Sequence, residues 1–334
     1  MNTPSYKYVN SKKFFRLKSY KASWYNIPIE PGGEWKMDKY VIINADDFGM
    51  CSAHNAATID LFRSGGITSA TIMAPCAAAR EAVDFAVNNP ELSVGVHLTT
   101  TSEWQSYRWG PVSSEAGSLV DGDGCFYRTC ADFARNATQS AVETELIAQI
   151  EKLCGMGLAP SHIDNHMGSL YGVANGDFRL LQLVIDIAGR YGLPFRFPEK
   201  ISHGMLSNGT LDIKIGKSAV SEAFGKFVAL AKDKGVLTPD YLIPGDWLGE
   251  QDKSFDNYKE YIFELYKTFD NGVTETYIHP AIECEEIKSI TPFWHRRVWE
   301  YRLFSDPQTV EFIKSIGIKL IGYRELEQIK APSP

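Results

Sequence analysis

The sequence predicts an α/β fold, an irregular TIM-like (β/α) barrel in a single domain. Short apolar runs rich in β-branched residues recur along the chain, and longer stretches with helical spacing separate them. Strands buried on both faces give such runs, and their alternation with helices implies parallel strands joined by crossovers. The pattern repeats over seven or eight units, which favours a closed or nearly closed barrel. An open doubly wound sheet is the alternative.

Eight apolar runs are the expected strands, and seven stretches between them are the expected helices. The strands are 40–45, 67–74, 92–98, 162–165, 195–198, 241–244, 274–279 and 318–322. The helices are 53–64, 77–88, 141–154, 178–191, 218–234, 258–269 and 307–315. The first helix stops at Gly65-Gly66, because glycine readily takes the left-handed conformation that ends a helix.

Two stretches interrupt the repeat of strand and helix. Residues 99–138 are rich in Gly, Ser and Trp, and residues 199–217 form a shorter insert. Loops as long as the first are usually functional or disordered in a compact domain. Neither stretch has enough core-type residues to form a domain. We therefore expect one barrel domain over residues 38–330, preceded by an N-terminal arm over residues 1–37.

Composition limits the classes of partner. The chain has 334 residues and a formal net charge of −7, so no nucleic-acid partner is expected, since that would need clustered Lys and Arg. No apolar run approaches the roughly 18–20 residues of a membrane span. The N-terminal residues lack the apolar core of a signal peptide. We expect a cytoplasmic protein with no membrane partner, and a mature exported form stays open.

Seven potential metal-binding side chains lie at the carboxyl ends of the expected strands. They are Asp46, Asp47, His97, His162, Asp164, His166 and His279. In a parallel barrel these positions share one edge, where barrel enzymes assemble their active sites. Carboxylates and imidazoles from several strands suit a divalent metal ion. Each residue alone has an ordinary structural explanation, and their convergence at one edge predicts a metal site.

The aspartate doublet and the histidine triplet contribute most to this prediction. An Asp after a strand is commonly a helix cap, but adjacent Asp46 and Asp47 repel each other unless a cation or proton lies between them. In an extended segment, alternation places His162, Asp164 and His166 on one face. Three titratable groups on one face at a strand end favour a functional site.

An aromatic cluster follows His97 in the long loop. It consists of Trp104, Tyr107 and Trp109. Such clusters usually pack a loop against the rest of the protein. Beside a metal site they also suit the stacking of a sugar ring, so both interpretations stay open.

Four blocks of sequence resemble the motifs of the YdjC-like carbohydrate deacetylases, which include the chito-oligosaccharide deacetylases. The blocks are NADDFG at 44–49, GVHL at 95–98, SHIDNH at 161–166 and IHP at 278–280, in the family's order. The resemblance extends over residues 38–330 and includes the closing helices. Two positions depart from the usual pattern, Gly168 in place of a histidine and Ala281 in place of a glycine. These departures concern the shape of the pocket and the substrate.

The resemblance implies an irregular (β/α) barrel that removes N-acetyl groups from an amino sugar or a short N-acetylated oligosaccharide. The implied ligands of one divalent metal ion are Asp47, His97 and His166. The other implied roles are general base for Asp46, general acid for His279, and support near the metal for His162 and Asp164. Imidazole ligands favour zinc on chemical grounds, and the resemblance also allows magnesium.

The sequence leaves other functions open. A non-haem iron oxygenase also uses two histidines and one carboxylate, but such enzymes have all-β folds. Another metal-dependent hydrolase on the same barrel, a phosphoesterase or an amidohydrolase, is a second alternative. A carbohydrate-binding protein that has lost its catalysis is the third. The sugar, its length, any phosphate on it and the formation of a homodimer are not determined.

Overall fold

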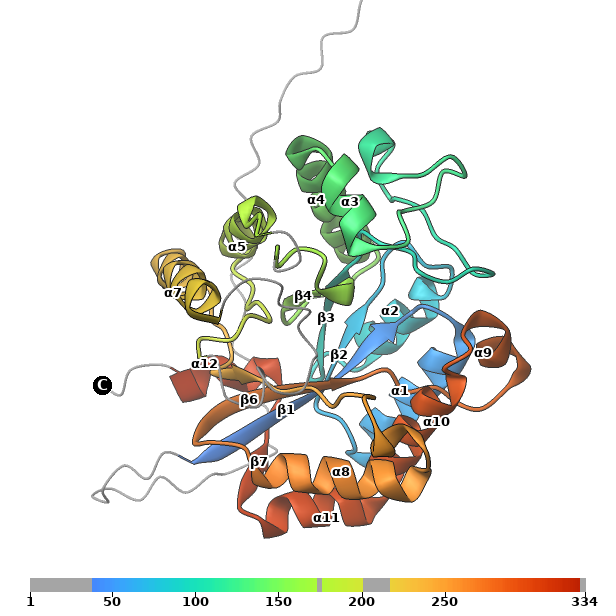
Figure 1. Ribbon diagram of the computed structural model, residues 1–334, viewed down its shortest axis with the longest axis vertical. Helices are drawn as coiled ribbons and strands as arrows, with labels where there is room; N and C mark the ends of the chain where they lie inside the picture. The colour runs from blue at the N-terminus through green and yellow to red at the C-terminus, as the bar shows by residue number, and fades with distance from the viewer. Residues whose placement is uncertain (1–37, 173–175, 201–216, 331–334) are drawn as a thin grey trace, which may run out of the picture. The chain divides into compact units, whose positions relative to one another are not determined.

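Seven strands form one curled parallel sheet, with helices on its outer side, in residues 38–172, 176–200 and 217–330, which the computed structural model describes (Figure 1). The hydrogen-bonded order is β4-β3-β2-β1-β6-β5, and β7 also pairs with β1. The strands are β1 (Lys39–Phe48), β2 (Ser69–Ile72), β3 (Ser93–Leu98), β4 (Ile163–Asn165), β5 (Tyr241–Leu242), β6 (Gly272–Ile278) and β7 (Ile318–Leu320). The alternation of strand and helix therefore gives the predicted parallel α/β architecture.

The barrel is not fully closed, so of the closed or nearly closed barrel that the sequence predicts, the structure has an open, curled sheet. Residues 195–198 do not form the expected strand. Only Phe195 pairs with β4, through a single parallel bridge to Ile163. On its other side the Phe195 N–H donates to the backbone oxygen of Leu237, which precedes β5. Isolated hydrogen bonds thus replace a ladder between β4 and β5. Proline lacks the N–H that a ladder needs, and Pro194 and Pro198 flank this segment.

The seven expected helices are present, the last with the expected bounds and the other six with shifted ends. They are α1 (Ser52–Ser64), α2 (Ala79–Asn88), α4 (Gln139–Gly155), α5 (Arg179–Tyr191), α7 (Lys217–Asp233), α8 (Phe255–Lys267) and α11 (Pro307–Ser315). Four more helices were not among the expected ranges: α3 (Cys130–Asn136), α9 (Glu285–Ile290), α10 (Trp294–Ser305) and α12 (Tyr323–Lys330). As predicted, α1 ends at Gly65, whose φ of 75° is left-handed. Charged and aromatic residues are mixed along α10, which hides its apolar side from a sequence pattern.

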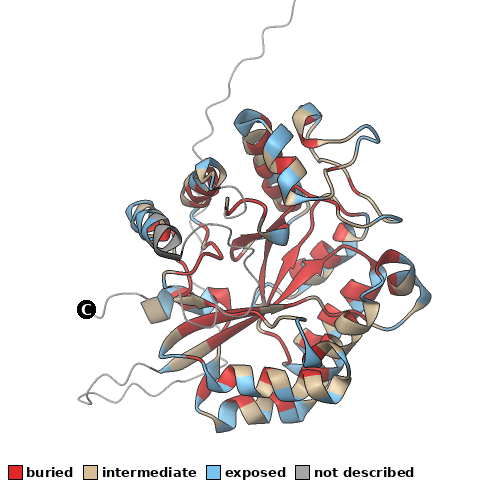
Figure 2. Cartoon of the chain, in the orientation of Figure 1, coloured by how far each residue is buried: buried red, intermediate tan, exposed pale blue. Residues whose placement is uncertain are grey.

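The core lies on both faces of the central strands. All residues of β2 and β3 are buried, as are the residues of β1 from Val41 onward (Figure 2). This burial is the reason for their continuous apolar runs. None of the described helices has the length and apolarity that crossing a bilayer requires.

The long stretch 99–138 is packed onto α4 and is not a free loop. The backbone N–H groups of Val112 and Ser113 donate to the buried carboxylate of Glu145 on α4. Gln149, one turn further along α4, bonds both the N–H and the backbone oxygen of Thr99. These contacts fix the stretch over the carboxyl ends of β3 and β4. The predicted arm, residues 1–37, lies outside the described residues.

Candidate metal centre and active site

The two neighbouring aspartates lie in the irregular end of β1. The register with β2 shifts between Ala45 and Phe48, and Asp47 has a φ of 62°. Left-handed backbone costs a non-glycine residue roughly 1–2 kcal/mol, so tertiary contacts must hold Asp47 in it. In a regular strand, neighbouring side chains face opposite sides of the sheet. The irregularity lets both buried carboxylates reach the neighbourhood of His97.

Asp47, His97 and His166 form a compact buried triad, as predicted. Asp47 Oδ1 lies 3.5 Å from His97 Nε2 and 3.4 Å from His166 Nδ1, and the two nitrogens are 3.3 Å apart. Ligand atoms about 2.0–2.1 Å from a tetrahedral zinc ion would be roughly 3.4 Å apart. Asp47 Oδ1 is buried and has no hydrogen-bond partner in the described part of the chain. An unpaired buried carboxylate oxygen is costly, so the triad fits a divalent cation.

A second group of potential ligands shares His97 with the first and consists of Asp46, His97 and Asp164. The guanidinium of Arg196 already pairs with both of its carboxylates. Arg196 Nη1 and Nη2 each lie 2.7 Å from an oxygen of Asp46, and Nη2 is also 2.9 Å from Asp164 Oδ2. A second cation would meet this fixed positive charge. The geometry therefore favours one metal ion, at Asp47.

Each histidine of the triad has a carboxylate on its far nitrogen. His97 Nδ1 is 2.7 Å from Asp164 Oδ1, and His166 Nε2 is 2.9 Å from Glu103 Oε2. A proton on each far nitrogen leaves the nitrogen that faces Asp47 free to bind a metal. Burial lowers the pKa of His166, but Glu103 and Asp47 outweigh it and raise this pKa to about 10. A cation at the triad would compete with that proton.

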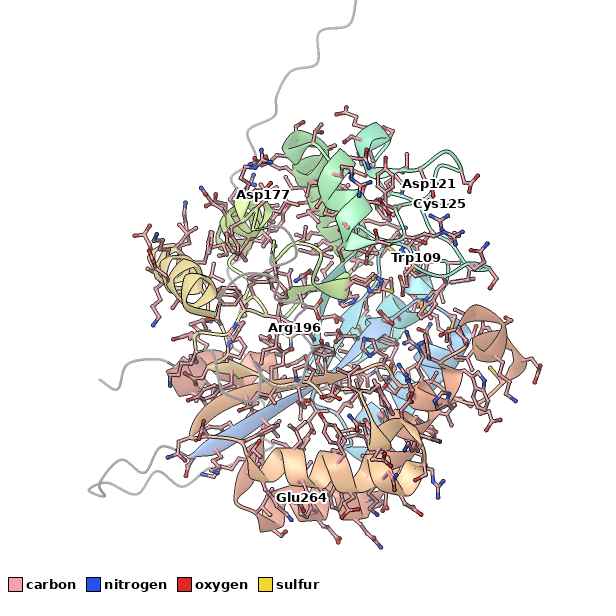
Figure 3. The ribbon with its side chains drawn as sticks, viewed as in Figure 1. Trp109, Asp121, Cys125, Asp177, Arg196 and Glu264 are labelled. Carbon is pink, nitrogen blue, oxygen red and sulfur yellow. The ribbon has the colours of Figure 1, made fainter. Side chains whose placement is uncertain are left out.

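Asp46 is held by two hydrogen bonds from Arg196, which is labelled near the middle of the view in Figure 3. Asn44 Nδ2 donates a further hydrogen bond of 2.8 Å to Asp46 Oδ1. Burial raises the pKa of Asp46, yet Arg196 lowers it to about 2, so the carboxylate stays ionised. Arg196 is itself fixed by Glu275 at 2.7 Å and lies over the ring of Tyr277. The predicted general base is thus a charged and firmly oriented group.

Arg297 of α10 holds the other oxygen of Asp47. Its Nη1 lies 3.0 Å from Asp47 Oδ2 and 3.2 Å from His54 Nε2. Burial, together with the neighbouring Arg297, keeps the pKa of His54 well below its usual value, so this ring is neutral. The guanidinium also lies over the ring of Trp104, 5.5 Å from its centroid. Arg297 therefore fixes Asp47 through one oxygen and leaves the other to the triad.

His279, the predicted general acid, is half-buried and directly follows β6. The backbone N–H of His279 donates to Glu300 Oε2 at 2.8 Å, and the imidazole ring lies edge-on to Tyr277. Burial lowers the pKa of His279, and Asp47 opposes that effect while Arg297 adds to it. Among the described residues, no hydrogen bond or ion pair joins His279 to the three residues of the triad.

His162 makes no hydrogen bond or ion pair with the triad among the described residues, so its supporting role near the metal stays a prediction. Its ring stacks on Tyr323 with a centroid distance of 3.7 Å, and its Nε2 lies 3.4 Å from Ser69 Oγ. Burial keeps the pKa of His162 well below the usual value. Asp164, by contrast, touches both His97 and Arg196, as its predicted supporting role requires.

The aromatic cluster divides between the two interpretations. Trp109 is buried, donates from Nε1 to the backbone oxygen of Thr101 and lies edge-on to His166, so it packs the loop. Tyr107 donates to a backbone oxygen and also packs the loop. Trp104 is half-buried beside Arg297, and its indole N–H has no partner in the described ranges. Trp104 therefore leaves the sugar-binding interpretation open, and its indole nitrogen is itself shielded from solvent.

Three neighbours of the triad were not predicted: Glu103, Arg196 and Arg297. Arg196 did leave a trace in the sequence, since a charged residue inside the apolar run FRFP needs a buried partner. Glu103 and Arg297 left none. Glu103 lies in an irregular stretch, and Arg297 is one of two adjacent arginines in an unexpected helix.

The chain is similar to proteins named carbohydrate deacetylases over most of its length. A carbohydrate deacetylase of Brevibacillus brevis is 35% identical over 287 residues, which cover 86% of this chain and 99% of that protein. One from Geobacillus stearothermophilus is 29% identical and covers 88% of this chain and 100% of its own length. A crystal structure from Enterococcus faecalis V583, of a proposed cellobiose-phosphate cleavage protein, matches 86% of this chain and 99% of that one. Its TM-score is 0.67 and its identity is 26%.

The family match extends beyond the motifs to most of the described fold, and only β7 and α12 at its carboxyl end lie outside the matched residues. The model of the family described as YdjC-like protein matches residues 40–315, from the start of β1 to the end of α11. All the triad residues, both buried arginines and His279 fall inside this range. The chain therefore belongs to the YdjC-like protein family.

Proposed function

We propose that this protein is a metal-dependent carbohydrate deacetylase that removes N-acetyl groups from an amino sugar or a short N-acetylated oligosaccharide. The observation that carries the proposal is Asp47 Oδ1, which is buried, accepts no hydrogen bond in the described chain and lies between the nitrogens of His97 and His166. The names of the Brevibacillus and Geobacillus relatives support the reaction and the substrate class. The barrel domain of the proposal comprises residues 38–330.

Asp47, His97 and His166 would hold the metal ion. Bound there, a divalent ion supplies Lewis acidity, which polarises the acetyl carbonyl and makes water a better nucleophile. The two imidazole ligands favour zinc over magnesium on chemical grounds. Arg297 pairs with Asp47 Oδ2 and so leaves Oδ1 directed at the two histidines.

Asp46 would accept the proton that the attacking water loses. The water oxygen forms a bond to the acetyl carbon, and collapse of the tetrahedral carbon breaks its bond to nitrogen. Arg196 and Asn44 hold the carboxylate ionised and aimed. With a pKa of about 2, Asp46 is a weak base that stays ionised at neutral pH. Its contribution to the rate would therefore come from how its carboxylate is positioned.

His279 would donate a proton to the departing nitrogen, which would otherwise leave as a strongly basic anion. Because burial lowers its pKa, the imidazolium of His279 is a stronger acid than free histidine. The hydrogen bond from the backbone N–H of His279 to Glu300 fixes the backbone at the end of β6. The products are acetate and the free amino sugar.

The sugar would lie over Trp104, beside the triad. The ring is half-buried and its N–H lacks an acceptor in the part of the chain described. An aromatic face suits the apolar side of a sugar ring, and an indole N–H suits a hydroxyl or carbonyl oxygen. A cytoplasmic location and a homodimer stay predictions.

Two alternatives lose support from the fold and the site. Non-haem iron oxygenases of the facial-triad type are all-β, whereas this sheet is parallel and flanked by helices. A phosphoesterase with two metals would need a second cluster, and Arg196 fills the one next to the triad. A single-metal deacetylase needs neither feature.

The test combines metal analysis with acetate release. The purified full chain is loaded with Zn²⁺ or Mg²⁺, its metal content is measured, and acetate is assayed on N-acetylglucosamine and its oligomers, with and without phosphate. We expect one bound ion per chain and metal-dependent acetate release from at least one of these sugars. A stoichiometric metal with no acetate from any N-acetylated sugar would contradict the proposed reaction, and no bound metal would contradict the site.

A further inference from the structure

Glu103 is the first carboxylate of the long stretch 99–138 and contacts the triad from outside the sheet. Its Oε2 lies 2.9 Å from His166 Nε2. The Glu103 side chain is 17% exposed, and that of His166 is 5% exposed. The contact is therefore largely removed from water, where a charge-assisted hydrogen bond is stronger than at the surface.

His166 needs an external partner because it has left the sheet. β4 ends at Asn165, and His166 begins a short 3₁₀ turn, η2 (His166–Gly168), in which Met167 has a left-handed φ of 55°. His97, by comparison, lies within β3 and is oriented by Asp164 on the neighbouring strand. The sheet thus fixes the ring of His97, whereas a turn carries the ring of His166.

The long stretch is tied to this same turn at neighbouring positions. The hydroxyl groups of Thr100 and Ser169 are 2.8 Å apart, and Ser169 Oγ donates to the backbone oxygen of His166. Thr101 Oγ1 lies 3.4 Å from Met167 Sδ. Glu103 lies two residues after Thr101, so the contacts that hold the turn also place its carboxylate.

We propose that Glu103 is a positioning residue of the metal centre. It would hold the proton on His166 Nε2, present Nδ1 to the cation at Asp47, and strengthen Nδ1 as a donor through its negative charge. The stretch 99–138 then completes the metal site as well as covering it. This inference rests on the proposed function only in requiring that the triad binds a metal. Carboxylate partners of ligand histidines typically change metal affinity by about 10–100-fold.

The experiment measures metal affinity and the ligand field, independently of turnover. Full-length protein is loaded with Co²⁺, its visible absorption spectrum is recorded, and the ion is withdrawn by titration with a chelator. The variants are Glu103→Ala, Glu103→Gln and Glu115→Gln. Glu115 is exposed in the same stretch and serves as the matched control for the loss of one negative charge.

We expect Glu103→Ala to bind Co²⁺ roughly 10–100-fold more weakly and to change the visible spectrum. Glu103→Gln keeps an oxygen acceptor without the charge, so its affinity should fall between those of Glu103→Ala and the unchanged protein. Glu115→Gln should match the unchanged protein in both measurements.

Unchanged affinity and spectrum in a folded Glu103→Ala protein overturn the inference. If that variant does not fold, Glu103→Gln decides, and unchanged Co²⁺ affinity there overturns it too. Failure of the unchanged protein to bind Co²⁺ or Zn²⁺ is a different outcome, because it contradicts the proposed function itself.

Discussion

Arg196 donates two hydrogen bonds of 2.7 Å to Asp46, although the two residues are 150 positions apart in the chain. This two-point contact orients the carboxylate as well as keeping it charged. Lysine cannot reproduce the planar fork of arginine, since its charge sits on a single nitrogen. Arg196 also forms an ion pair with Asp164, so it connects the proposed base to the residue that orients His97.

Arg196→Lys should therefore keep the metal and lose rate. We expect kcat for acetate release to fall by roughly 10²-fold, the low end for a proton-transfer residue, because Asp46 loses one of its two anchors. Steady-state kinetics with parallel metal analysis check this. Arg190→Lys, at an exposed ion pair with Glu143, is the control and should leave kcat unchanged. Full activity in Arg196→Lys would show that the fork is not needed.

The adjacent aspartates should separate into a metal ligand and a base. Asp47→Ala is expected to lose the metal ion and activity together, because Asp47 Oδ1 faces both histidine nitrogens. Asp46→Asn should retain the metal and lose about 10²–10⁴-fold in kcat. Metal content and acetate release are measured on the same samples, with exposed Asp123→Asn as the control. Turnover at the original rate in Asp46→Asn would remove that residue from the role of base.

His279 should matter most for poor leaving groups. His279→Gln is expected to slow release of acetate from an N-acetyl sugar by about 10²–10⁴-fold, because the amine leaves unprotonated. An activated acetate ester has a good leaving group, so its hydrolysis should fall much less. The comparison of both substrates checks this, and His295→Gln, a surface position paired with Asp252, is the control. Equal losses on both substrates would contradict the role of acid.

Glu300 gives a prediction for stability against pH. Burial raises the pKa of Glu300 from 4.5 to about 8, with Asp46 and Asp47 adding to the rise. The folded state therefore keeps a proton that the unfolded state releases between about pH 4.5 and 8, so this group's contribution to stability is lost as pH rises through that window. Glu300→Gln removes the ionisation and should keep the bond from the His279 N–H.

The free energy of unfolding in urea should decrease less with pH for Glu300→Gln than for the unchanged protein. The difference in unfolding free energy between Glu300→Gln and the unchanged protein should grow from pH 5 to pH 8 by at most about 1.4 kcal/mol per pH unit. Glu115→Gln, which removes an exposed carboxylate, should run parallel to the unchanged protein. A pH-independent difference for Glu300→Gln would mean that Glu300 is already ionised in the folded state.

The sequence by itself determined the class of fold and most of the candidate metal site. Parallel strands end at one edge, so Asp47, His97 and His166 were predicted to meet because each follows or ends an apolar run. Alternation along the chain is a local property, and the hydrophobic pattern records it directly.

Tertiary structure decided the closure of the barrel and the neighbours that tune the site. Prolines on either side of Phe195 limit it to one bridge, and no periodicity reveals how the gap between β4 and β5 is filled. Arg297 contacts Asp47 across 250 residues, and Glu103 reaches His166 from an irregular stretch. The ring of His162 stacks on Tyr323, a partner more than 150 residues away that no local pattern indicates. Such partners depend on how distant elements dock, and docking is set by the packing of whole surfaces, which a local pattern does not record.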